Sequence, residues 1–121
     1  MTPAQAAAEV LRRREAAGSM EKWIAYRGSQ FTPALHQRLL ISELEQIASG
    51  DNRRLMVFMP PGSAKSWYVS VEFPTWYLGN HGDKSVIGAS HTQELAERFG
   101  RRVRNLVADE KFKAAFGFGL S

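Results

Sequence analysis

The sequence predicts an α/β fold, in which a few parallel strands lie between flanking helices and follow a set of N-terminal helices. Two short apolar runs indicate the strands, LMVFM at residues 55–59 and KSVIGAS at residues 84–90. Segments with helical periodicity come before, between and after these runs. A short unbroken apolar run is typical of a strand that is buried on both faces of a parallel sheet. The order contains too few strands to complete a doubly wound sheet.

The composition is that of an ordinary globular chain, with 121 residues of which 44% are hydrophobic and 23% are charged. The formal net charge of +4 permits a polyanionic partner without requiring one. The absence of cysteine excludes a disulfide framework and a thiolate metal site. The sequence has no apolar run that approaches the roughly 18 residues of a membrane span, and LRRRE interrupts any signal-peptide core. We therefore expect a cytoplasmic protein without a membrane partner.

The N-terminal arm, residues 1–30, is expected to be helical and to pack on the rest of the chain. Alanines and charges predict a helix over residues 3–17, capped by Thr2 and ended by Gly18. The expected anchors that follow it are Trp23, Ile24 and Tyr26. The run from Arg12 to Arg14 favours a solvated helix face over a DNA contact, because three basic residues are few for a nucleic-acid footprint.

The second helix is expected to begin at Thr32 and Pro33 and to stop at Gly50, since apolar residues recur at helical spacing between them. The third begins at Lys65 after the first strand, and Pro74 is expected to kink or end it. The last helix begins near His91 and is the most amphipathic segment. Its apolar stripe consists of Leu95, Phe99, Val103, Leu106 and Val107, and its polar stripe includes Arg98, Arg101 and Arg102.

The segment FMPPGSAKSWY, residues 58–68, has the pattern of a phosphate-binding loop between a strand and a helix. Such a loop turns several N–H groups toward phosphate oxygens, and the helix N-terminus adds partial positive charge. Lys65 is placed to reach the β and γ phosphates, and the Ser66 hydroxyl is placed to bind Mg²⁺. Met59 and Ala64 stand where the usual pattern has glycine, so an ordinary strand-to-helix turn remains the alternative.

Three segments together resemble the large subunit of tailed-phage terminases, the ATP-driven motor that packages viral DNA. They are FTPALHQRLLISELEQIASGDNRRLMVFMPPGSAKS, WYVSVEFPTWYLG and SVIGASHTQELAERFGRRVRNLVADEKF, which cover residues 31–113. Each segment is moderately specific, and their order and spacing are more so. The resemblance implies an incomplete P-loop NTPase core, with residues 31–121 as the N-terminal portion of an ATPase domain.

The resemblance also implies a set of site residues, with ATP and Mg²⁺ as the ligands. The nucleotide-binding residues are Pro61, Gly62, Ser63, Ala64, Lys65 and Ser66, with Ser66 as the Mg²⁺ ligand. Gln37 matches a glutamine that hydrogen-bonds the adenine edge in this superfamily, and an exposed helix position is an equal alternative. The implied partners are double-stranded DNA, the terminase small subunit and the portal, in the cytoplasm of a bacterial host. Trp67 departs from the family pattern, where a small or polar residue is usual.

A competent ATPase of this class needs a further strand that ends in Asp and Glu. NLVADE, residues 105–110, imitates that strand, but Leu106 and Val107 complete the helical stripe, so we reject it. In the family this acidic motif lies beyond the point where this sequence stops, which implies a piece of a motor that lacks a catalytic residue. Two alternatives remain open: a non-catalytic module that binds DNA or a partner through Arg98, Arg101 and Arg102, or a fragment of a helicase-like ATPase. Unpaired strand edges also predict self-association.

Overall fold

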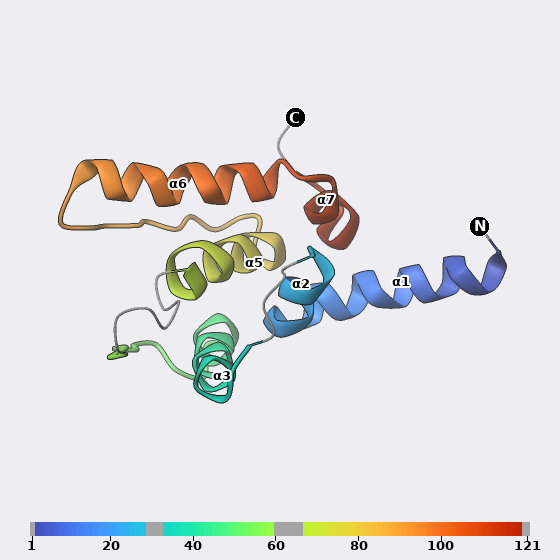
Figure 1. Cartoon of the computed structure of the whole chain (residues 1–121), viewed down its shortest axis with the longest axis horizontal. Coiled ribbons are helices and arrows are strands. Elements are labelled where there is room, and N and C mark those ends of the chain that lie inside the picture. The colour runs from blue at the N-terminus through green and yellow to red at the C-terminus, as the bar shows by residue number, and fades with distance from the viewer. Residues whose placement is uncertain (1, 29–32, 60–66, 120–121) are drawn as a thin grey trace.

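The computed structural model describes residues 2–28, 33–59 and 67–119, and these ranges form helices joined by turns and extended segments. In chain order the helices are α1 (Pro3–Gly18), α2 (Met20–Tyr26), α3 (Leu35–Ser49), the π-helix η1 (Tyr68–Glu72), α5 (Phe73–Asn80), α6 (Gln93–Val107) and α7 (Glu110–Phe116). Figure 1 shows α6 along one side of the molecule, α5 beneath it and α3 on the opposite side, while the N-terminal end of α1 projects away.

The predicted α/β fold is wrong for the described residues, which contain no strand and no sheet. Residues 55–59 and 85–90 lie outside any helix and run as drawn-out segments (Figure 1), and no backbone hydrogen bond joins either segment to another described residue. Met56 and Phe58 are 79% and 83% exposed, and Ile87 is 93% exposed. A strand is stabilised by the ladder it forms with a neighbour, and local apolar content does not supply that neighbour. The expected parallel strands of a P-loop NTPase core are therefore absent from this part of the chain.

The helical prediction for the N-terminal arm is confirmed. The Gln5 N–H donates to the Thr2 hydroxyl oxygen at 3.1 Å, and the Thr2 N–H donates to Gln5 Oε1 at 2.9 Å, so both groups form a capping box at α1. The chain turns at Ser19, whose side chain accepts the Lys22 N–H at the start of α2. Trp23 and Ile24 are buried, as expected of anchors.

Helix α3 begins later than predicted. Ala34 occupies the cap position, and its N–H donates to Gln37 Oε1 at 2.9 Å. The predicted cap, Thr32, lies outside the described residues. The end of the helix is as expected, because Gly50 adopts a φ of 85°, which costs a glycine little.

The helical segment after the loop changes type partway along. Residues 68–72 form a π-helical turn, and the Phe73 N–H donates to the Tyr68 carbonyl across it. Pro74 is the second residue of α5, which follows this π-helical turn directly, with no break in the helical backbone between them. The helix therefore continues past Pro74, and does not end there.

Helix α6 agrees with the sequence prediction, whereas α7 is a helix that the sequence analysis did not predict. Thr92 caps α6 by accepting the Leu95 N–H at 3.2 Å. Asp109 caps α7, and residues 105–107 belong to α6, so the rejection of an acidic strand at residues 105–110 is confirmed. Phe112 is completely buried and packs edge-on to Trp23 at 6.0 Å between ring centroids, whereas Phe118 is 46% exposed.

The hydrophobic core lies where α2 meets α3, η1, α5 and α7. Its buried members are Ala16, Met20, Trp23, Ile24, Leu40, Ile41, Leu44, Tyr68, Trp76 and Phe112. The arm is thus part of the core, and the Trp76 indole donates to the Ala17 carbonyl at 3.1 Å to join α5 to α1. Within the described ranges, none of the helices has the length and apolar character needed to cross a membrane.

Candidate functional site

The predicted phosphate-binding residues themselves cannot be placed. Pro61, Gly62, Ser63, Ala64, Lys65 and Ser66 all lie outside the described residues. The structure does describe the segments on either side, which are the extended residues 55–59 and the helical segment from Trp67 onward. The site can therefore be built from the residues that surround its two ends.

Gln37 lies beside the first residue of η1. The Tyr68 hydroxyl donates to Gln37 Oε1 at 3.4 Å, although the two residues are 31 positions apart in the sequence. Burial raises the pKa of Tyr68, and the negative charge of Glu72 raises it further, while Arg27 opposes both effects. Tyr68 therefore remains a neutral hydrogen-bond donor near neutral pH, and the position of Gln37 close to the end of the loop is a consequence of helix packing.

A buried carboxylate organises the residues that follow the loop. Glu72 is completely buried, forms an ion pair with Arg27, and accepts a hydrogen bond from Trp67 Nε1 at 2.9 Å. Trp67 and Glu72 are five residues apart, a spacing that an α-helix would rotate to different faces. The wider π-helical turn brings them to one face. We call Arg27, Trp67, Glu72 and Arg102 the Trp67 cluster.

Two buried polar atoms of the Trp67 cluster lack a hydrogen-bond partner among the described residues. They are Glu72 Oε2 and Arg27 Nε. A buried ion pair is stabilised only when its remaining polar atoms are also satisfied.

The outer end of the Trp67 cluster is cationic. The Arg102 guanidinium carbon lies 5.3 Å from the centroid of the Trp67 ring, and that of Arg27 lies 5.6 Å from it. Such distances allow a cation–π attraction. Arg27 is neutralised by Glu72, whereas no ion pair is described for Arg102 with another described residue. The cluster therefore presents a positive charge through Arg102.

The other two arginines predicted to contact DNA or a partner have different surroundings. Arg98 lies 4.0 Å from the Glu94 carboxylate on the same helix, in a pair that is exposed on both sides. Arg101 is exposed to solvent. The structure therefore brings Arg102 to the Trp67 cluster and leaves Arg98 and Arg101 on the solvated face of α6.

A separate cavity of about 610 Å³ has none of the four members of the Trp67 cluster in its lining. Both extended segments contribute to its walls, through Leu55 and Val57 on one side and Val86 and Ile87 on the other. Side chains from α3, η1, α5 and α6 complete the lining, including Phe99 and Val103 of the predicted apolar stripe. The apolar face of α6 is thus only half-buried, since it faces this cavity.

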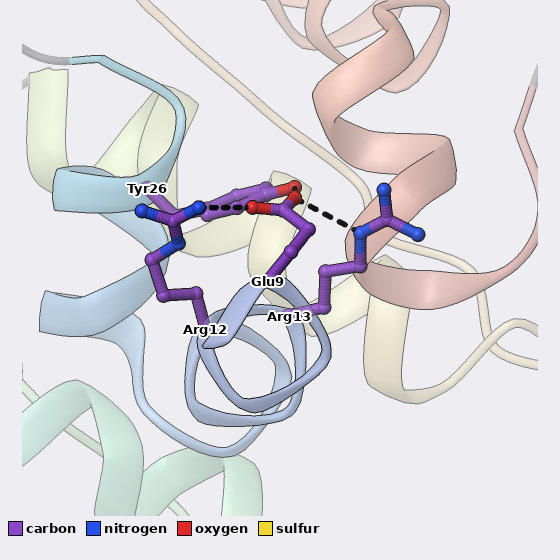
Figure 2. Close-up of polar contacts among 4 residues, drawn as sticks. All are labelled: Glu9, Arg12, Arg13 and Tyr26. Atoms are coloured by element: carbon purple, nitrogen blue, oxygen red, sulfur yellow. Dashed lines mark hydrogen bonds and ion pairs between the residues drawn. The ribbon is translucent and has the colours of Figure 1, made fainter. Parts of the chain in front are cut away.

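Two arginines of the run in the N-terminal arm, Arg12 and Arg13, share the carboxylate of Glu9. Figure 2 shows Arg12 and Arg13 on either side of Glu9, with Tyr26 beside the same carboxylate. Arg12 and Arg13 pair with Glu9 at 2.5 and 3.0 Å, and the Tyr26 hydroxyl donates to it at 2.8 Å. These contacts, Tyr26 first and then the two arginines, lower the pKa of Glu9 to about 2. The Tyr26–Glu9 hydrogen bond joins α2 to α1, and Arg12 and Arg13 hold the same carboxylate, which supports a structural role for these two arginines.

The implied Mg²⁺ site has no acidic or imidazole cluster to support it in the described ranges. No group of three or more His, Asp or Glu side chains there is arranged to hold a metal ion. The expected ligand, Ser66, lies outside these ranges.

Comparisons with known proteins add no relative. No family model matches this chain, and neither does any curated protein or any solved structure.

Sequence reasoning did not find the Trp67 cluster. Glu72 has the sequence neighbourhood of an ordinary helix residue, and its partner Arg27 is 45 positions away. The one available signal was Trp67 itself, an indole directly after the loop that departs from the family pattern. Its N–H needs a buried acceptor, and Glu72 supplies it.

Proposed function

We propose that this chain binds ATP with Mg²⁺ through residues 61–66 and Gln37, as the nucleotide-binding segment of a viral DNA-packaging motor similar to the terminase large subunit. The observation that carries the proposal is the contact between Tyr68 and Gln37 at 3.4 Å. Gln37 and the loop were assigned to one nucleotide site by resemblance alone. In the structure Gln37 contacts the residue two positions after Ser66, which supports that assignment.

The proposal concerns the ligand and requires no sheet within the described residues. Phosphate binding by a loop before a helix depends on main-chain N–H groups, the helix N-terminus and a lysine. Helical structure is described from Trp67 onward, directly after the loop. Lys65 supplies the charge for the phosphates, Ser66 binds Mg²⁺, and Gln37 hydrogen-bonds the adenine edge.

The biological setting follows from the resemblance. The motor would act in the cytoplasm of a bacterial host, on double-stranded viral DNA, with a small subunit and a portal as its protein partners. The net charge of +4 agrees with a DNA partner.

Calorimetric titration with ATP in the presence of Mg²⁺ tests the proposal. The parent chain is expected to bind, and Lys65→Ala is expected to weaken binding at least tenfold, because it removes a charge-assisted contact of about 1.5–3 kcal/mol. Lys84→Ala is the matched control, since Lys84 is an exposed lysine on the second extended segment. If the parent does not bind, or both variants bind as the parent does, residues 61–66 form a plain turn.

A second candidate function is DNA or partner binding by the arginine face of α6. This helix has no fully buried residue and exposes Arg98, Arg101, Arg102 and Arg104. Titration with a DNA duplex at two salt concentrations tests it. Substituting Arg101 should lower both the affinity and its salt dependence, since each phosphate contact releases counterions.

A further inference from the structure

The Trp67 indole is held in a defined orientation. Its N–H donates to Glu72 Oε1 at 2.9 Å, and Glu72 is itself fixed by burial and by its ion pair with Arg27. A ring whose one polar atom is anchored to a buried carboxylate cannot rotate without breaking that hydrogen bond. Trp67 is therefore a rigid surface on which a neighbouring group can be oriented.

Arg102 is the group that lies on this surface. Its guanidinium carbon is 5.3 Å from the ring centroid, within the range of a cation–π contact. Arg102 is exposed, so its remaining N–H donors are open to solvent and to a ligand. Arg101, the preceding residue on α6, has the same charge and no described contact with the ring.

We propose that Arg102 binds a phosphate group of the ligand and that Trp67 and Glu72 are positioning residues that orient it. The inference rests on the proposed function, since Trp67 directly follows Ser66 in the sequence. It adds to the expected site a second cation, the guanidinium of Arg102 on α6, which lies 35 residues after Trp67 in the sequence. A guanidinium held against a ring keeps its planar fork of donors available, and that geometry suits phosphate oxygens.

The proposal distinguishes Arg102 from its neighbours by orientation. A free arginine must lose side-chain entropy when it binds a ligand. The contact with Trp67 already restricts the Arg102 side chain, so Arg102 loses less entropy on binding. Its contribution to ligand affinity should therefore exceed that of Arg101. The Glu72 carboxylate does not cancel the charge of Arg102, because it is paired with Arg27.

Calorimetry on matched variants tests the proposal, with ATP, inorganic triphosphate and adenosine as separate probes. Arg102→Gln is expected to weaken ATP and triphosphate binding about tenfold and to leave adenosine binding unchanged. Arg101→Gln should change each affinity less than about twofold. Trp67→Phe keeps a ring and removes the N–H, so it should weaken ATP binding less severely than Arg102→Gln.

The double variant separates positioning from a general structural effect. If Trp67 acts through Arg102, then Arg102→Gln should cost much less affinity in the Trp67→Phe background than in the parent. Circular dichroism on each variant confirms that the helices persist. Full additivity of the two substitutions would overturn the positioning roles of Trp67 and Glu72.

The outcomes also separate this inference from the proposed function. If Lys65→Ala abolishes ATP binding while Arg102→Gln behaves as Arg101→Gln does, the inference is wrong and the proposed function stands. If neither Lys65→Ala nor Arg102→Gln has an effect on ATP, both are wrong. A parallel titration with a DNA duplex identifies the phosphate source: loss of DNA binding without loss of ATP binding would overturn the nucleotide assignment of Arg102.

Discussion

Arg27, directly after α2, forms an ion pair with Glu72, the last residue of η1, although the two lie 45 positions apart in the sequence. The pair joins the N-terminal arm to the helix that follows the predicted phosphate loop. Glu72 is completely buried, and the Arg27 side chain is only 15% exposed. The arm is therefore attached to the candidate site by charge as well as by apolar packing.

Removing the Glu72 charge should be strongly destabilising. Glu72→Gln leaves Arg27 buried without a compensating charge, which is expected to lower the free energy of unfolding by about 3–5 kcal/mol. Glu21→Gln is the control, since it removes the carboxylate of the more exposed Glu21–Arg38 pair at 3.3 Å and should cost less than about 1 kcal/mol. Urea unfolding measures both. Equal losses of unfolding free energy in the two variants would show that the buried Arg27–Glu72 pair contributes no more to stability than the exposed Glu21–Arg38 pair.

The Glu9 contacts should make the packing of α1 on α2 within the arm depend on pH. The folded pKa of Glu9, about 2, lies below its ordinary value of 4.5, so its contribution to stability is fully present above pH 4.5. That contribution is lost as the pH falls through 4.5 toward 2. The difference in unfolding free energy between the parent and Glu9→Gln should therefore shrink over this interval. A difference that stays constant from pH 7 to pH 2 would contradict the assignment of the low pKa to Glu9.

The exposed apolar side chains of the extended segments predict self-association of the isolated chain. Phe58 is 83% exposed, and it lies on a segment whose backbone groups have no described partner. An apolar segment with unpaired backbone groups can pair with another chain, as an unprotected strand edge does. Phe58→Lys should reduce the average mass measured by light scattering. Val10→Lys, which changes a 48% exposed residue of α1, should not. A parent that is a monomer at all concentrations would refute this prediction.

The chain is also expected to bind ATP without hydrolysing it at an appreciable rate. Asp109 caps α7 and Glu110 begins that helix, so neither is held at the end of a strand in the way an ATPase needs. A coupled assay for released phosphate should give the same rate for the parent and for Lys65→Ala. Turnover that depends on Lys65 would require Asp109 and Glu110 to be examined as catalytic groups.

Helices were predictable from this sequence because their signals are local. The spacing of Leu95, Phe99 and Val103, with Thr92 as a cap, was enough to place α6 within two residues of its observed start. The two predicted strands were wrong, because a strand is not specified by a local signal in the same way. LMVFM is extended and its exposure alternates from Leu55 to Met59, but a sheet requires a second segment at hydrogen-bonding distance, and no local pattern encodes that distance.

The candidate site was predictable only in part. Gln37 was named from a resemblance, and the structure places it beside Tyr68. Arg102 was grouped with Arg98 and Arg101 by helical spacing, which cannot show that it alone lies over an indole. Glu72 was missed because its contact with Trp67 depends on a π-helical turn, and sequence periodicity assumes 3.6 residues per turn.

The central claim is that Gln37, Tyr68 and residues 61–66 form one nucleotide site. Photoaffinity labelling with an ATP analogue that carries its reactive group on the adenine ring, followed by mass spectrometry, tests it most directly. The account predicts labelled peptides around Gln37 and Tyr68, with labelling suppressed by excess ATP and absent from Lys65→Ala. Labelling that excess ATP does not suppress, or that occurs only on α6, would contradict it.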